Sequence, residues 1–221
     1  MSLFTSTVGR KIIMAITGQL MVLFVIVHLL GNSSIFIGPN GINAYAEHLH
    51  SLGPLVWVFR LIMLVLVSLH GWFGIQLTLE NKAAATTTYA VNRKLKASFA
   101  GENMIWTGLI VLAFIVYHLL HFTARVTPDI VAGTDAAGRY DVYTMVVSSF
   151  QHGAIALIYI VAMIALLLHL FHGIQSFFQT MGWNSERSQC RITTGGRVVA
   201  AILGLGYIAI PVSILIGILN K

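Results

Sequence analysis

Residues 12–37 read IIMAITGQLMVLFVIVHLLGNSSIFI and contain no Asp, Glu, Lys or Arg. About 20 consecutive apolar residues are enough for a helix to cross the hydrocarbon core of a bilayer. Because a backbone in lipid must satisfy its own hydrogen bonds, such a stretch is predicted to be a transmembrane helix. Four more stretches without these charged residues follow, at 61–79, 103–124, 142–185 and 198–220. The expected fold class is therefore all-α, an integral membrane bundle of five transmembrane helices.

The composition of the 221 residues excludes an ordinary soluble domain. Hydrophobic residues make up 57% and charged residues 9%, with a mean hydropathy of +0.84, whereas soluble domains carry about 25% charged residues. The apolar stretches recur along the whole chain, which argues against a secretory signal followed by a soluble domain. We therefore expect one membrane domain over residues 1–221, with helices at 12–37, 54–79, 103–126, 149–179 and 195–219.

Cysteine usage limits the cofactors that the chain can hold. Cys190 is the only cysteine, which excludes a disulfide framework, a tetrathiolate zinc site and an iron-sulfur cluster within this chain. No C-x-x-C-H sequence occurs, which excludes covalent attachment of haem through that motif. The pI of about 9.7 comes from Lys and Arg at the ends of the apolar stretches, where anionic lipid explains them, and no nucleic-acid partner is expected.

The distribution of Lys and Arg predicts the orientation of the bundle. Cytoplasmic loops of membrane proteins carry an excess of these residues. Nine of the 13 lie on the side of the N-terminus, which is therefore expected in the cytoplasm. The nine are Arg10, Lys11, Lys82, Arg93, Lys94, Lys96, Arg187, Arg191 and Arg197, and the other four are Arg60, Arg125, Arg139 and Lys221.

Histidine is the unusual residue of this apolar chain, which holds nine of them. An ionisable side chain inside a membrane span is costly and marks a functional site by default. Four predicted helices each contribute one: His28, His70, His118 and His169. At a rise of 1.5 Å per residue, His28 and His118 lie about 26 and 24 Å from the charged residues at the inner ends of their helices, but His70 and His169 only about 15 Å.

Two depths with two imidazoles each are what two haems need, since each iron takes one axial ligand from each of two facing helices. Gly31, Gly74 and Gly173 lie about one helical turn beyond three of these histidines and are expected to let a flat macrocycle approach. His121 and His172 follow His118 and His169 by three residues, so the spacing leaves open which member of each pair is the ligand. Hydrogen-bonded packing residues and the histidine relays of a haem-free transporter are the alternatives.

Around these histidines the chain resembles a known family. The segments are FVIVHLLG at 24–31, SLHGWFG at 68–74, FIVYH at 114–118 and LLHLFHG at 167–173. They are similar to the dihaem cytochrome b558 membrane anchor of succinate dehydrogenase or fumarate reductase, of the type with five helices in one polypeptide. The resemblance implies that His70 and His169 bind the inner of two b haems and that His28 and His118 bind the outer one. It also makes His121 and His172 neighbours of the haem pockets.

The resemblance further implies what surrounds the chain. An iron-sulfur subunit and a flavoprotein subunit would be its partners at the cytoplasmic membrane of a prokaryote, and the dicarboxylate chemistry would belong to the flavoprotein. Electrons would pass to or from menaquinone or another quinone in the lipid bilayer. A dimer of whole complexes is left open. The cytochrome b of a membrane hydrogenase or formate dehydrogenase is an alternative that would share the bis-histidine haems.

A quinone site is expected near the outer haem, where a carboxylate or an imidazole can exchange protons with the quinone oxygens. Glu47, His48 and His50, just before Pro54, are the candidates, and a solvated loop is the alternative. Relatives that move a compensating proton through the membrane carry a glutamate two residues before the ligand of the fourth helix. Leu167 stands there in this chain, so no such proton path is expected.

Overall fold

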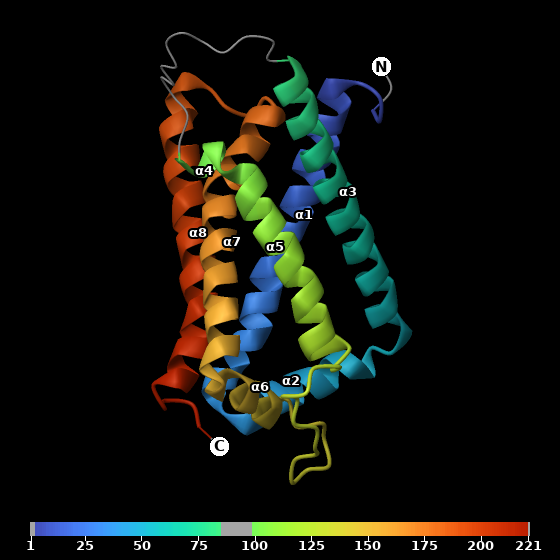
Figure 1. Ribbon diagram of the computed structural model, residues 1–221, viewed down its shortest axis with the longest axis vertical. Coiled ribbons are helices and arrows are strands. Elements are labelled where there is room, and N and C mark those ends of the chain that lie inside the picture. The colour runs from blue at the N-terminus through green and yellow to red at the C-terminus, as the bar shows by residue number, and fades with distance from the viewer. Residues whose placement is uncertain (1–2, 85–98, 221) are drawn as a thin grey trace.

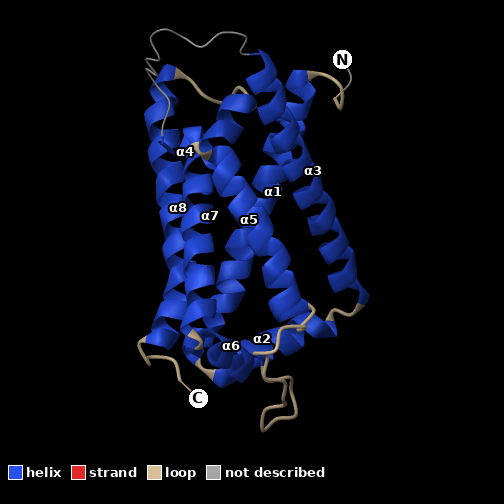
Figure 2. Cartoon of the chain, viewed as in Figure 1, coloured by secondary structure: helices blue, strands red, loops and turns tan. Residues whose placement is uncertain are grey.

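A computed structural model describes residues 3–84 and 99–220. Five of its helices are long and apolar enough to cross a membrane, which confirms the predicted all-α bundle (Figure 1). They are α1 (Thr7–Ser33), α3 (Pro54–Ala84), α5 (Met104–His118) together with the helical turn that continues it to Thr123, α7 (Gly153–Thr180) and α8 (Glu186–Leu215). A short helix, α4 (Phe99–Glu102), precedes α5. The part of the chain that the structure describes holds no strand (Figure 2), and Arg93, Lys94, Lys96 and Lys221 of the charge count lie outside it.

The outer faces of these helices carry large apolar side chains, as expected for surfaces in contact with lipid. Val27 and Leu30 of α1, Leu64 of α3 and Leu205 of α8 each leave more than half of their surface exposed. In water such a surface would drive aggregation, whereas in a bilayer it meets hydrocarbon. The chain is thus a multi-pass membrane protein.

Local sequence explains where the spans begin. The hydroxyl group of Ser6 accepts a hydrogen bond from the backbone N–H of Gly9 at 3.1 Å and caps α1. Proline has no N–H to lose in the first turn of a helix, and α3 begins at Pro54. Ser185 and Ser188 form a reciprocal capping box, so α8 begins at Glu186 rather than at the predicted residue 195.

Two short helices lie across the end of the bundle opposite to the N-terminus (Figure 1). They are α2 (Pro39–Ser51) and α6 (Val142–Gln151), and a 3-10 turn, η1 (Ser34–Ile37), joins α1 to α2. Gly38 lies between η1 and α2, and its φ of +102° favours glycine. The helix predicted at 149–179 is interrupted by His152, whose extended backbone separates α6 from α7.

The third predicted span is not a regular α-helix to its end. After His118, a π-helical turn covers Leu119–Thr123, and the N–H of Ala124 donates to the carbonyl oxygen of Leu119 at 2.7 Å. Turns of this kind are rare and occur frequently at functional sites.

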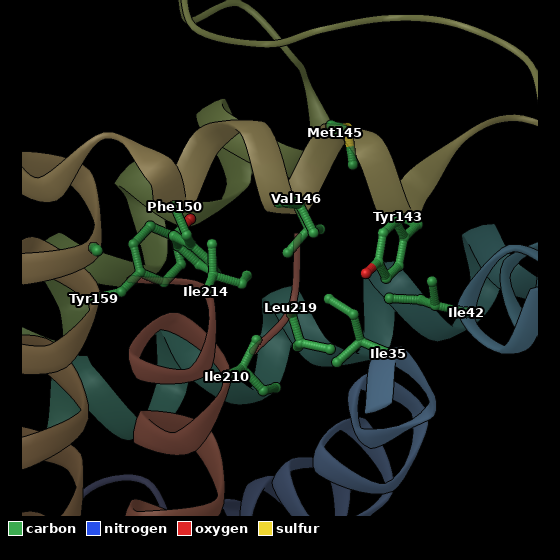
Figure 3. Packing of buried hydrophobic residues seen from close by; sticks show 12 residues of the cluster. Ile35, Ile42, Tyr143, Met145, Val146, Phe150, Tyr159, Ile210, Ile214 and Leu219 are labelled. Atoms are coloured by element: carbon green, nitrogen blue, oxygen red, sulfur yellow. The ribbon is translucent and has the colours of Figure 1, made fainter. Parts of the chain in front are cut away.

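Two apolar clusters hold the bundle together. The first surrounds α6, where Phe150 lies beside Ile214 of α8 and Tyr143 lies beside Ile42 of α2 (Figure 3). The second lies between α1, α7 and α8 and includes Val22, Leu170 and Leu203. The hydroxyl group of Tyr207 also donates to the carbonyl oxygen of Val25 at 2.7 Å, which ties α8 to α1.

Asn43 joins α2 to the segment that leads into α6. Its side chain is fully buried. The amide nitrogen donates to the carboxylates of Asp135 at 3.2 Å and Asp141 at 3.1 Å, and the amide oxygen accepts from the N–H of Tyr143 at 2.9 Å. The guanidinium group of Arg139 bonds the carboxyl group of Asp135 and lowers its pKa to about 2. Asn43 therefore faces an ionised carboxylate at neutral pH.

We expect the substitution Asn43→Ala to lower the thermal midpoint of the purified complex. It leaves the buried N–H of Tyr143 without its partner, which costs about 1–3 kcal/mol, and it removes one donor from each of the two carboxylates. Differential scanning fluorimetry of the intrinsic tryptophan fluorescence measures the midpoint. Asn40→Ala, at an exposed position of the same helix, is the control, and equal midpoints for the two variants would contradict the account.

Candidate haem sites

His70 of α3 and His169 of α7 meet in the half of the bundle nearer the N-terminus, level with Thr17 of α1. Their ring centroids are 6.1 Å apart and their planes cross at 70°. Both side chains are partly buried. The structure thus brings together the two histidines that were predicted to share the inner haem.

His28 of α1 and His118 of α5 meet nearer the opposite end. Their ring centroids are 6.0 Å apart with an interplanar angle of 84°. His70 packs against Gly18 of α1, and His28 follows Gly18 by ten residues, so the two pairs are separated by about 15 Å along that helix. The two predicted depths are present in the fold.

The geometry of both pairs fits a bis-histidine haem. An iron takes each imidazole nitrogen at about 2 Å, and the ring centre lies about 1 Å further out, so two axial rings have centres about 6 Å apart. The measured separations, 6.1 and 6.0 Å, match this requirement. Edge-to-face ring pairs commonly lie at such distances, as His118 and Phe122 do at 6.0 Å, so the spacing is compatible with a haem at each pair.

At the His70–His169 pair, hydrogen bonds determine which ring nitrogen carries the hydrogen and which keeps the lone pair. The Nδ1 atom of His70 lies 3.0 Å from the carbonyl oxygen of Met14 and 3.4 Å from the hydroxyl of Thr17. That hydroxyl already donates to the backbone of its own helix, so it can only accept from His70. The hydroxyl of Thr107 is placed in the same way, 3.3 Å from Nδ1 of His169. Both rings therefore carry hydrogen on Nδ1 and leave the Nε2 lone pair for a metal.

Two glycines let these rings lie against the neighbouring helices. A Cβ atom on Gly18 would come within 2.9 Å of Cε1 of His70, and one on Gly108 within 3.2 Å of Cε1 of His169. Each glycine directly follows the threonine that accepts from the same ring. Neither position was predicted, because each glycine precedes the histidine of its own helix and contacts a histidine of another helix.

The predicted small residues have different surroundings. Among the residues that the structure describes, none lies within 4 Å of a Cβ atom built on Gly173, and only the sulfur of Met14, at 3.8 Å, approaches one on Gly74. The helix surfaces one turn beyond His70 and His169 thus leave the space that a flat macrocycle requires. At Gly31 the ring of Tyr45 of α2 occupies the corresponding space, so this glycine serves the packing of α2.

The structure distinguishes His118 from His121. His121 is fully buried, and its Nδ1 and Nε2 atoms lie 2.8 Å from the Tyr159 hydroxyl and 2.8 Å from the Asp129 carboxylate. A ring with both nitrogens engaged has no lone pair for a metal, whereas His118 faces His28. His172 makes no ring contact with another histidine of the described chain.

A cavity of about 300 Å³ opens at the end of the bundle where α2 lies. Its lining includes Glu47 and His50 of α2, together with Arg125, Arg139 and Tyr140. The Nδ1 atom of His50 donates to the carbonyl oxygen of Ala46 at 2.8 Å, which leaves its Nε2 atom free to accept. His48 is exposed and does not line this cavity. All three candidates lie on α2, in a segment for which no helix was predicted.

A family model described as the succinate dehydrogenase/fumarate reductase transmembrane subunit matches residues 4–102 and 103–205, nearly the whole chain. The chain belongs to this family. It is therefore a membrane subunit of an oxidoreductase complex with further subunits, which favours that interpretation over the cytochromes b of hydrogenases and formate dehydrogenases. No curated protein and no solved structure matches the chain.

The two matched segments of this transmembrane subunit repeat one pattern. Each contains M-x-x-T-G with a histidine ten residues after the glycine, and later a histidine with a glycine four residues beyond. The first copy is Met14, Thr17, Gly18, His28, His70 and Gly74, and the second is Met104, Thr107, Gly108, His118, His169 and Gly173. In the structure each segment supplies one ring to each histidine pair. A search for internal repeats would have found the signal.

Leu167 of the succinate dehydrogenase/fumarate reductase subunit faces α8. A Cβ atom on Gly204 would come within 2.6 Å of Cδ1 of Leu167. The position two residues before His169 thus packs between helices, and a glutamate there would need a different arrangement of α8.

Proposed function

We propose that the chain is the dihaem cytochrome b anchor of a succinate:quinone oxidoreductase. His70 and His169 bind one b haem, and His28 and His118 bind the other. The observation that supports this most strongly is that four imidazoles from four helices meet in two pairs at two depths, each at a spacing compatible with one iron between the rings. Bound there, the haems supply one-electron transfer through the apolar interior.

The residues of the chain hold and orient these groups. Thr17 and Thr107 keep hydrogen on the Nδ1 atoms of His70 and His169, so that the Nε2 atoms are presented as ligands. The helices around them exclude water from the route between the two depths. The whole of residues 1–221 acts as one membrane domain in this proposal.

The charge distribution supports the orientation of the complex. With the N-terminus in the cytoplasm of a prokaryote, the end that holds the His70–His169 pair faces the iron-sulfur subunit and the flavoprotein subunit beyond it. Succinate oxidation or fumarate reduction then takes place on the flavoprotein, and this chain connects it to the quinone pool of the cytoplasmic membrane.

The cavity beside α2 is the proposed site for menaquinone or another quinone. It lies at the same end of the bundle as the His28–His118 pair. Glu47 supplies a carboxylate, and the free Nε2 atom of His50 supplies an acceptor. Such groups can exchange protons with the two oxygens of a quinone as it is reduced.

We expect Glu47→Gln to slow succinate-driven quinone reduction by about 100-fold, since the loss of a positioned acid or base costs that much or more. Succinate oxidation with a soluble dye, which takes electrons from the partner subunits, should stay unchanged. His48→Gln on the same helix, outside the cavity, is the control. Equal quinone rates in the two variants would place the quinone elsewhere.

The complex purified through a tag on this chain tests the proposed function. Succinate is expected to reduce a b-type haem, seen as an alpha band in the reduced-minus-oxidised spectrum, and added quinone should reoxidise it. A preparation that shows no haem band even after dithionite reduction would refute the proposal.

A further inference from the structure

A line of polar side chains leads from the end of the bundle opposite to the N-terminus to one of the paired histidines. The carboxylate of Asp129 lies 2.8 Å from Nε2 of His121, and Nδ1 of His121 lies 2.8 Å from the hydroxyl oxygen of Tyr159. That oxygen in turn lies 3.4 Å from Nδ1 of His118. The line therefore ends on the ring that faces His28.

Asp129 is the charged end of this line. Burial opposes the ionisation of its carboxyl group, but the hydrogen bond with His121 helps to hold the pKa below its ordinary value. An ionised carboxylate can only accept hydrogen bonds. Nε2 of His121 must then be the donor of the bond between the two groups.

The remaining directions follow from this first one. In the tautomer with hydrogen on Nε2 alone, His121 accepts at Nδ1, so the hydroxyl group of Tyr159 donates to it. The oxygen of Tyr159 is left with lone pairs, and it accepts from Nδ1–H of His118. In each of the three hydrogen bonds the donor is the group farther from Asp129 along the line. The Nε2 atom of His118 keeps the free lone pair that a metal ligand needs.

Apolar packing keeps the line in place. The ring of Tyr159 lies between those of Phe114, Phe122 and Phe150, with centroid separations of 4.9, 5.7 and 4.8 Å. His121 stacks on Phe122 at 4.0 Å. Hydrogen bonds in such a dry environment are electrostatically stronger than in water and polarise one another.

The other three histidines of the two pairs have no comparable connection. His70 donates to a carbonyl and a hydroxyl oxygen, and His169 to a hydroxyl oxygen. The side chain of His28 makes no hydrogen bond with the residues that the structure describes. Only His118 is connected to a carboxylate, which makes its ring the most electron-rich of the four.

We propose that Asp129, His121 and Tyr159 position His118 as an axial ligand and lower the reduction potential of the haem that it shares with His28. This inference rests on the proposed function, because it needs a haem at that pair. An electron-rich axial ligand stabilises the oxidised iron relative to the reduced iron, and the partners behind a ligand are known to tune metal sites in this way. The three residues act through His118 and are positioning residues.

Redox titration of the purified complex tests the inference, with Asp129→Asn and Tyr159→Phe as the variants. The two midpoint potentials are first assigned with His28→Ala and His70→Ala, each of which should remove one of them. We expect both variants to raise the potential of the His28–His118 haem by about 59 mV, a tenfold change for one electron, and to leave the other haem unchanged. Tyr117→Phe is the control, since Tyr117 lies 5.4 Å from His121 in the same aromatic cluster.

The possible results separate the inference from the function on which it rests. A complex without haem refutes the proposed function itself. Two haems whose potentials in Asp129→Asn and Tyr159→Phe equal those in Tyr117→Phe refute the inference alone. If Tyr159→Phe loses haem, Asp129→Asn decides, because the amide keeps the size and one accepting oxygen and removes only the charge. The low-spin electron paramagnetic resonance signal of the same haem should shift together with its potential.

Discussion

Replacing His118 with alanine is expected to halve the haem content of the purified complex, from two b haems per chain to one. The ring of His118 faces His28 at 6.0 Å, and no other imidazole of the described chain can take its place. His121 is held by Tyr159 and Asp129 through both of its nitrogens, so it cannot move to the iron without giving up two buried hydrogen bonds.

The matched variant is His121→Gln, which should keep both haems. Haem is quantified as the pyridine haemochrome and divided by the amount of the chain. A normal haem content in His118→Ala together with a halved content in His121→Gln would move the ligand to His121 and overturn the pairing. The corresponding comparison of His169→Ala with His172→Gln tests whether His169 is the ligand that pairs with His70.

Replacing Gly18 with valine is expected to remove the haem of the His70–His169 pair. Even the first added carbon would come within 2.9 Å of Cε1 of His70, closer than real side-chain contacts, and valine adds two further methyl groups. The ring must then turn or move away from its position opposite His169. Disturbing the surroundings of a ligand typically weakens metal binding by about 10–100-fold.

Haem content after dialysis against apomyoglobin, which captures released haem, measures this loss. Gly195→Val is the control, because nothing lies within 4 Å of a Cβ atom at that position of α8. Gly108→Val should act like Gly18→Val through His169. If Gly18→Val retains haem as firmly as Gly195→Val, the close approach of α1 to His70 has no part in haem binding.

The five spans could be predicted because each is a long apolar stretch, and in lipid that pattern permits only a helix. The pairing of the histidines by depth was predictable for the same reason, since the rise of a helix converts residue number into depth. Their meeting in the fold depends on helix packing, which the sequence pattern alone does not contain. The structure supplies that step for His28 with His118 and for His70 with His169.

The ends of the helices were less predictable. Gly38 and Pro39 indicate a turn, but proline also begins helices, and α2 follows at once. The π-helical turn after His118 has no composition of its own that would distinguish it from a regular helix. In the line from Asp129 to His118, Tyr159 contacts His121 and His118, which precede it by 38 and 41 positions in the chain. Only the tertiary structure brings these residues together.

The haem content of the intact complex tests the central claim most directly. The complex should be purified with all of its subunits, and haem b should be quantified against this chain. We predict two haems b for each copy of the chain. A stoichiometry of zero or one would contradict the assignment of His28 with His118 and His70 with His169 as two bis-histidine sites.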